Sequence, residues 1–306
     1  MKDYSDPLSA EDRRMFGLVA PLAFGHYAWV KDRVQDPVEE AGSGILVAPR
    51  LGLSARHVSQ GFERLDDRIE GVRRRIGPLE PQYATHKIEP AYSTMVFQVP
   101  KSEEERVEWV IDVDWPSPDT DITTLQVLPE SDIAKERDAA GLTYFEWLLL
   151  PPPIGATVRI YGWPRPKIKN DAGWSHSQAI EFWGDGAKVK EYVYPLQDHG
   201  MTNFPGFRLD REFDHGFSGS PVFYDNALVG IFSGPDVVAS LWPLALMTYP
   251  DRAGKEHAFA DHFDSGLIRV RDWSKVKGQV ERWECEDALR RSSTETRCLK
   301  KHAVLR

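Results

Sequence analysis

Short apolar segments broken by glycine and proline dominate the pattern of hydrophobic positions, and they predict strands rather than long helices. Residues 42–58 contain two such segments joined by a turn, and residues 92–99 and 107–113 alternate between apolar and polar side chains. Residues 228–234 form an apolar, β-branched run that is typical of a buried strand. The pattern therefore predicts a chain that is mostly β.

Apolar residues at helical spacing in residues 60–76 predict a short surface helix or a long loop, and residues 129–140 and 279–291 are further helix candidates. The glycine-rich sequence at residues 184–186 is a strong turn signal, so we expect a hairpin between residues 178–183 and 188–194. Three consecutive prolines at residues 151–153 form a stiff connector of the kind that separates packed units. They place a boundary between two units near residue 150.

The composition is that of an ordinary globular protein, with 306 residues of which 41% are hydrophobic and 28% are charged. The formal net charge of -9, from 38 basic and 47 acidic residues, argues against a nucleic-acid partner, which would require a basic surface. No apolar run approaches the roughly 20 residues of a membrane span, and the N-terminus lacks the apolar core of a signal peptide. We therefore expect a cytoplasmic protein with no membrane partner.

The cysteines and histidines do not predict a metal site. Cys285 and Cys298 lack the paired spacing of zinc ligands, and unlinked thiols fit a reducing compartment. His257 and His262 are five residues apart, so they would not share a helix face, and we expect them at the surface. No metal or other cofactor is expected.

The most informative stretch of the sequence holds a serine between glycines. Residues 216–221 read Gly-Phe-Ser-Gly-Ser-Pro and place Ser218 on a tight turn that points its hydroxyl outward. A serine hydroxyl needs a base to become a nucleophile, and the base needs a group that orients it. His57, just past an apolar strand, and Asp121, at the start of an alternating strand, are the candidates for these two roles.

Three segments around these residues resemble those of the trypsin-like serine proteases, the family with the chymotrypsin fold. Residues 54–58, Ser-Ala-Arg-His-Val, are similar to the family's Thr/Ser-Ala-Ala-His segment. Residues 121–125, Asp-Ile-Thr-Thr-Leu, are similar to Asp-Ile-Ala-Leu-Leu, and residues 216–222 are similar to Gly-Asp-Ser-Gly-Gly-Pro-Val. The order His, Asp, Ser separates this family from subtilisin-like enzymes and α/β-hydrolases.

The resemblance implies a role for each of these residues. His57 would be the general base, Asp121 would orient its imidazole, and Ser218 would be the nucleophile. The backbone N–H groups of Gly216 and Ser218 would form the oxyanion hole.

The resemblance also implies an all-β fold of two antiparallel six-stranded β-barrels, with a helical insertion and a C-terminal extension. The first barrel, residues 16–150, would carry the base and the acid, and the second, residues 151–250, would carry the serine. Residues 240–247 are similar to the family's closing strand. Residues 251–306 match nothing in the family and would form the extension.

Substrate binding is assigned by the resemblance to Glu212, Ser233 and Gly234. Glu212 falls where the family places the floor of its primary pocket, and a carboxylate there would favour Arg or Lys before the cut. The alternative is that Glu212 is an exposed loop residue. Ser233 corresponds to a family serine that supports the acid and whose backbone pairs with substrate.

Two residues of the turn at residues 216–221, here called the serine turn, depart from the family pattern. Phe217 replaces the aspartate that captures a newly cut N-terminus, so activation by that salt bridge is excluded. The turn must then be held by packing, or be ordered when substrate or a partner binds. Ser220 replaces a glycine, which requires ordinary backbone angles at that position.

The leading hypothesis is an intracellular serine endopeptidase that hydrolyses peptide bonds of protein or peptide substrates through an acyl-enzyme. Because an unregulated protease would harm a cell, we also expect a regulatory protein partner that gates the activity through residues 251–306. One alternative is a catalytically silent, protease-like scaffold that binds peptides. Another is an esterase that acts on small acyl groups.

Overall fold

The computed structural model describes residues 15, 18–25, 28–30, 33–35, 38–59, 92–97, 107–162, 183–193, 205–213, 217–251, 253–271, 273–274 and 277–278. The segments predicted as helices at residues 60–76 and 279–291 lie outside the described residues, as do Cys285, Cys298 and Gly216.

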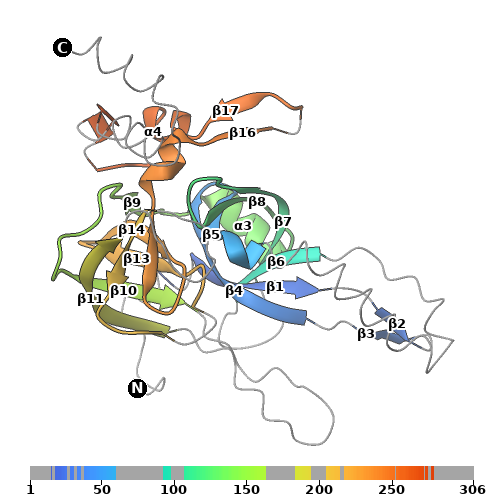
Figure 1. The fold of residues 1–306 in the computed structure, drawn as a ribbon. Coiled ribbons are helices and arrows are strands. Elements are labelled where there is room, and N and C mark those ends of the chain that lie inside the picture. Colours follow the sequence, from blue (N-terminus) through green and yellow to red (C-terminus); the bar gives the residue numbers. More distant parts are fainter. Residues whose placement is uncertain are drawn as a thin grey trace, which may run out of the picture.

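The first half of the chain forms a closed antiparallel barrel, seen in blue and green in Figure 1. Its strands, in order around the ring, are β1 (Val19–Gly25), β4 (Val38–Ala48), β5 (Leu51–Ala55), β8 (Ile122–Pro129), β7 (Val107–Pro116) and β6 (Tyr92–Phe97). β6 pairs with β1 and so closes the ring. All five residues of β5 are buried.

The second half forms another ring, seen in olive to orange in Figure 1. Its strands, in order, are β10 (Thr157–Gly162), β11 (Trp183–Val193), β12 (Gly206–Leu209), β15 (Val237–Ser240), β14 (Ala227–Phe232) and β13 (Pro221–Tyr224). β13 pairs with both β14 and β10, which closes this ring as well. A further short strand, β9 (Glu146–Trp147), runs parallel to β14, although it precedes the prolines at residues 151–153.

The two rings have the same topology. If the six strands of each ring are numbered along the chain, both run in the order 1-2-3-6-5-4. The prediction of an all-β fold with two antiparallel six-stranded barrels, as in chymotrypsin-like proteins, is confirmed.

The smaller elements lie outside the two rings. The predicted helix near residues 129–140 is present as α3 (Asp132–Ala140), whose N-cap Ser131 accepts a hydrogen bond from the backbone N–H of Ala134. The others are β2 (Ala28–Val30), β3 (Arg33–Gln35), η3 (Trp242–Leu246), β16 (Thr248–Pro250), β17 (Glu256–Ala258) and α4 (Asp261–Asp264).

The prediction of a hairpin around residues 184–186 is wrong. β11 runs straight through these glycines and pairs with β10, with Gly184 opposite Tyr161 and Gly186 opposite Arg159. A Cβ atom at Gly184 would lie 2.6 Å from Cε1 of Tyr161. The glycine therefore makes room for an aromatic ring inside a sheet, rather than forming a turn.

The closing strand of the second barrel is also displaced from its predicted position at residues 240–247. The strand in that place is β15, which ends at Ser240, and the chain then turns into the 3-10 helix η3. Pro243 lies in the first turn of this helix. Proline lacks the N–H that a strand needs and has a backbone angle suited to a helix start, which explains the change.

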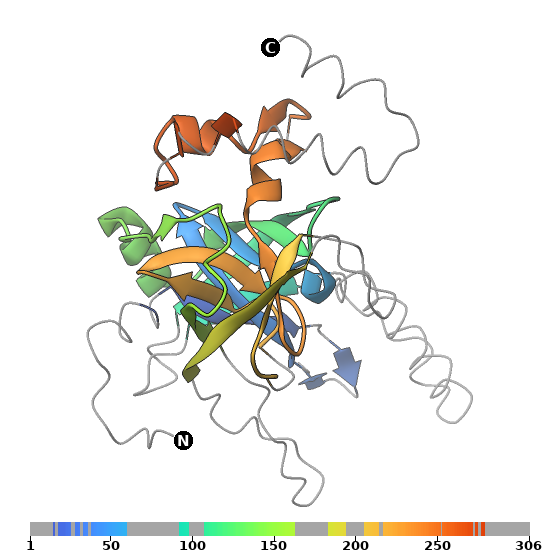
Figure 2. The ribbon, with the colours of Figure 1, turned by 60° about the vertical axis from the view of Figure 1, so that its left-hand side comes forward.

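The segment formed by residues 248–251 and 253–271 packs on the barrels. Figures 1 and 2 show it, in orange and red, on one side of the two rings. Phe259 and Phe263 are buried with their ring centroids 6.1 and 5.6 Å from that of Trp147 on β9. The backbone N–H of Trp147 donates to the carbonyl oxygen of Arg269. The Trp147 carbonyl oxygen accepts a hydrogen bond from the backbone N–H of Arg271. Val270 also forms a single parallel bridge to Trp147.

Candidate active site

His57 lies on a single helical turn, residues 56–59, that directly follows β5. The buried side chain of Val58 anchors this turn, and Ser59 Oγ donates to the carbonyl oxygen of Arg56. The imidazole remains one-third exposed, with a relative exposure of 33%. The strand thus fixes the backbone of His57 while its ring stays accessible.

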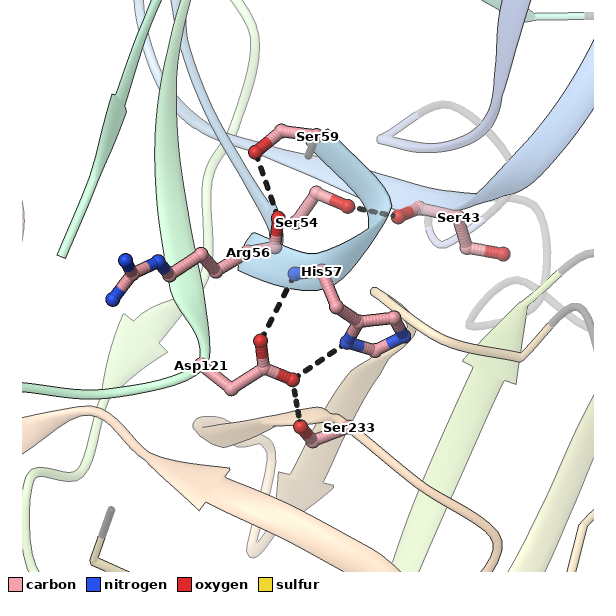
Figure 3. A network of polar contacts seen from close by, with 7 residues as sticks. All are labelled: Ser43, Ser54, Arg56, His57, Ser59, Asp121 and Ser233. Atoms are coloured by element: carbon pink, nitrogen blue, oxygen red, sulfur yellow. Dashed lines mark hydrogen bonds and ion pairs between the residues drawn. The ribbon is translucent and has the colours of Figure 1, made fainter. Parts of the chain in front are cut away.

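Asp121 is hydrogen-bonded to His57 through both carboxylate oxygens (Figure 3). Oδ1 accepts from the His57 backbone N–H at 3.0 Å, and Oδ2 lies 2.7 Å from the ring atom Nδ1. Because a carboxylate only accepts hydrogen bonds, Nδ1 is the donor and Nε2 is left as the basic nitrogen of the ring. This is the arrangement that a general base requires.

The carboxylate of Asp121 is buried, with a side-chain exposure of 6%. Burial of a carboxylate is costly unless it is well hydrogen-bonded. A third donor, Oγ of Ser233 at the end of β14, reaches Oδ2 from the second barrel. The acid is therefore held by groups from both barrels.

Ser218 lies on the predicted tight turn, between β12 and β13, and is half-buried. The turn is closed by a hydrogen bond from the Ser220 N–H to the Phe217 carbonyl oxygen at 2.8 Å. The Gly219 N–H donates to the Phe232 carbonyl oxygen on β14, also at 2.8 Å. These bonds attach the turn to the second barrel.

The serine turn also contacts the first barrel. The Ser43 N–H on β4 donates to the Ser218 carbonyl oxygen at 2.8 Å, and a Cβ atom at Gly42 would lie 2.5 Å from that oxygen and 2.9 Å from Val58. Since Val58 follows His57 directly, this contact brings the serine turn against the turn that carries the imidazole.

Gly219 is required at this contact. Its φ of +86° is left-handed, and a Cβ atom there would overlap the Ser43 carbonyl oxygen and Oγ of Ser54. Ser54 Oγ itself donates to the Ser43 carbonyl oxygen at 2.8 Å. Sequence reasoning assigned no role to Gly42, Ser43 or Ser54, but glycines inside a strand are a signal of close backbone approach.

The structure joins two of the three predicted catalytic side chains directly. His57 and Asp121 are hydrogen-bonded, whereas in the part of the chain that the structure describes no hydrogen bond links Ser218 Oγ to His57. Gly216, predicted for the oxyanion hole, lies outside the described residues.

The predicted substrate-binding residues occupy two segments. Glu212 is exposed, just after β12. Ser233 and Gly234 are buried at the tip of the β14–β15 hairpin, where both N–H groups donate to the Val237 carbonyl oxygen. The structure places these two segments side by side, because the Phe213 N–H, next to Glu212, donates to the carbonyl oxygen of Pro235, next to Gly234.

The two departures in the serine turn are accommodated by packing. Phe217 is buried, with its ring 5.6 Å from that of Phe213, which in turn lies 5.3 Å from Phe232. Ser220 has a negative φ, and its buried Oγ occupies space that Gly162 leaves open. An apolar contact thus replaces the missing aspartate on one side of Ser218, and a glycine on β10 makes room for the added hydroxyl on the other.

The residues that the structure describes contain neither a candidate metal cluster nor a candidate membrane-spanning helix. No group of three or more His, Cys, Asp or Glu side chains there is arranged to hold a metal ion. No helix in this part of the chain has both the length and the apolar character needed to cross a membrane.

No protein-family model and no curated protein sequence matches the chain. Among solved structures, it is similar to a kallikrein-related peptidase 10 in complex with Zn²⁺, with a TM-score of 0.39 and 12% identity over 76% of this chain and 93% of that one. It is also similar to neuropsin, described as a serine protease expressed in the limbic system of mouse brain, with a TM-score of 0.41 and 15% identity over 74% of this chain and 90% of that one.

Proposed function

We propose that this chain is an intracellular, trypsin-like serine endopeptidase. The observation that carries the proposal is the buried Asp121 carboxylate, which accepts hydrogen bonds from Nδ1 of His57 and from Ser233. This arrangement fixes the tautomer of His57, and the serine turn is held against the same barrel by the bond from Ser43 to Ser218.

The mechanism follows from these roles. Ser218 Oγ attacks the carbonyl carbon of a peptide bond while Nε2 of His57 takes the hydroxyl proton, and Asp121 stabilises the imidazolium. The C–N bond then breaks, and the leaving amine takes the proton from His57. Water, deprotonated by His57, hydrolyses the acyl-enzyme and restores Ser218. The N–H groups of Gly216 and Ser218 would stabilise the oxyanion in both halves of the reaction.

The bond between Ser218 Oγ and His57 must form during this cycle. In enzymes without substrate, catalytic hydrogen bonds are often long and tighten only when substrate binds. We therefore include a closing motion of the serine turn in the proposal. A preference for Arg or Lys before the cut, through the exposed carboxylate of Glu212, stays a prediction.

A fluorophosphonate probe tests the enzyme directly. We expect labelling of the unmodified protein at Ser218, and loss of labelling in both Ser218→Ala and His57→Ala. His257→Ala is the matched control, because His257 is also a partly exposed histidine but is paired with Asp251 in the C-terminal segment. Labelling that survives in His57→Ala would contradict the proposed mechanism.

A peptide-binding scaffold is the second candidate function, and the missing bond between Ser218 Oγ and His57 favours it. Fluorophosphonate labelling, combined with a peptide-binding measurement, distinguishes the scaffold from the protease. If the protein binds peptides but is never labelled, with or without added peptide, the scaffold is the better description.

Gating by a partner is a further part of the proposal. Because Phe259 and Phe263 are buried against Trp147, a truncation at residue 250 would remove part of the core. The informative truncation therefore removes only residues 279–306. We expect it to change either the labelling rate or the oligomeric state, and gating through this segment is abandoned if neither changes.

A further inference from the structure

Residues 117–122 form a small closed loop, here called the acid loop, that presents Asp121 to His57. The Ser117 N–H donates to the Ile122 carbonyl oxygen at 2.9 Å and closes the loop at its base. Within it, the Asp119 N–H donates to Ser117 Oγ at 3.4 Å. Ser117, Thr120 and Asp121 are all buried.

One residue, Arg56, holds the acid loop at both ends. Its backbone N–H donates to the Asp121 carbonyl oxygen at 3.1 Å. Its guanidinium Nη1 donates to the Ser117 carbonyl oxygen at 2.9 Å. Figure 3 shows the Arg56 side chain on the far side of the helical turn from the imidazole. Arg56 therefore binds the acid loop through two hydrogen bonds, and its guanidinium does not approach the reacting groups.

The charge of Arg56 is not used in an ion pair within the described residues. Its Nε is buried and has no hydrogen-bond partner there, and the single acceptor of its guanidinium is the Ser117 carbonyl oxygen. Partial burial of an unpaired cation is unfavourable compared with burial of an apolar side chain. Stability alone does not account for an arginine at this position.

We propose that Arg56 is a positioning residue, which locks the acid loop so that both oxygens of Asp121 stay aligned with His57. This inference rests on the proposed protease function, because it assigns Arg56 a role in orienting the general base. Asp121 must meet the backbone N–H and Nδ1 of His57 together, at 3.0 and 2.7 Å. A shift of the loop along its length would lengthen both contacts.

Two variants and a control test the proposal. Arg56→Met keeps the aliphatic stem and removes the donors, and Arg56→Lys restores one donor and the charge. Arg50→Met is the matched control, because Arg50 lies at the other end of β5 and bonds Asp138 at 2.7 and 3.0 Å, away from the acid loop. The measurements are the rate of fluorophosphonate labelling at Ser218 and the low-field proton resonance of His57 Nδ1–H.

We expect Arg56→Met to be labelled about tenfold more slowly than the unmodified protein and to lose or shift the Nδ1–H resonance. Arg56→Lys should recover part of both, and Arg50→Met should stay within about twofold of the unmodified rate. An unchanged resonance in folded Arg56→Met overturns the inference, as does an equal loss of labelling in Arg56→Met and Arg50→Met.

The resonance also separates this inference from the proposed function. If the unmodified protein is never labelled, the protease proposal fails, but the Nδ1–H resonance still reports whether Arg56 aligns Asp121 with His57. If Arg56→Met does not fold, Arg56→Lys decides: a resonance shifted from its unmodified position supports the inference, and one that is unchanged overturns it.

Discussion

Oγ of Ser233, on the second barrel, donates a hydrogen bond to the Asp121 carboxylate on the first barrel. The same carboxylate oxygen accepts the hydrogen bond from Nδ1 of His57. The acid of the candidate site is thus also a contact between the two barrels. Any relative movement of the barrels would disturb the orientation of the imidazole.

Ser233→Ala should therefore lower stability and labelling together. It removes one of three donors to a buried carboxylate, and a hydrogen bond to a charged group contributes about 1.5–3 kcal/mol. We expect the free energy of unfolding to fall by about 2 kcal/mol and labelling at Ser218 to slow by about tenfold. Urea unfolding and probe kinetics measure the two effects. Ser240→Ala, at another buried serine of the second barrel, should change neither strongly.

Gly219→Ala should be one of the most destabilising single substitutions in the chain. The residue has a left-handed φ, and its Cβ would overlap two oxygen atoms of the first barrel. The backbone strain and the overlap together should reduce the free energy of unfolding by about 3 kcal/mol or more. Denaturant unfolding measures this loss.

Gly155→Ala is the control for that experiment. Gly155 has a similar φ of +84°, but nothing lies within 4 Å of the position of its Cβ. It should therefore lose only the backbone contribution of about 1 kcal/mol. Equal losses in the two variants would mean that the contact between the serine turn and Ser43 contributes nothing.

Ser220→Ala should leave stability unchanged or raise it by up to about 1 kcal/mol. The Ser220 hydroxyl is buried and has no hydrogen-bond partner within the described part of the chain, so the protein gains nothing from its polarity. Ser54→Ala removes a buried hydroxyl that does have a partner, the Ser43 carbonyl oxygen. It should lower stability by about 1 kcal/mol. A larger loss in Ser220→Ala than in Ser54→Ala would contradict this assignment.

The strands that flank His57 and Asp121 were predictable because they depend on local sequence. β5 is a short, mostly apolar run that ends two residues before His57, and Asp121 directly precedes β8. Neither position requires knowledge of distant contacts. The hydrogen bond between the two side chains follows once the strands are neighbours in one barrel.

Some predictions failed because distant packing decides the local conformation. Gly184 was interpreted as part of a turn, but it is a glycine because the ring of Tyr161 covers it from a neighbouring strand. The hydrogen bond from Arg56 to the Ser117 carbonyl oxygen joins groups that are 61 residues apart in the sequence. A backbone carbonyl carries no sequence signal, so only coordinates reveal such a contact.

Protonation of His262 in mild acid should lower the stability of the segment formed by residues 248–251 and 253–271. Its Nε2 lies 2.7 Å from the Tyr249 hydroxyl, and its ring packs against Phe259 with a centroid distance of 5.2 Å. Burial lowers the pKa of His262 below its ordinary value of 6.5; nearby His257 adds to this effect and Asp261 opposes it. Burial, together with the charges of Asp261 and Asp251, raises the pKa of Tyr249. The fold therefore favours neutral His262.

The unfolded chain then binds a proton at a higher pH than the folded chain does. Stability is complete above about pH 6.5 and falls as the pH drops from there towards the folded-state pKa. We expect urea midpoints to decrease over this range, and His262→Gln, which can still bond Tyr249 but cannot be protonated, to flatten the decrease. Above about pH 5 the carboxylate of Asp251 stays ionised, because its hydrogen bond to His257 lowers its pKa below 3.8. A pH profile that is the same in His262→Gln would show that another group is responsible.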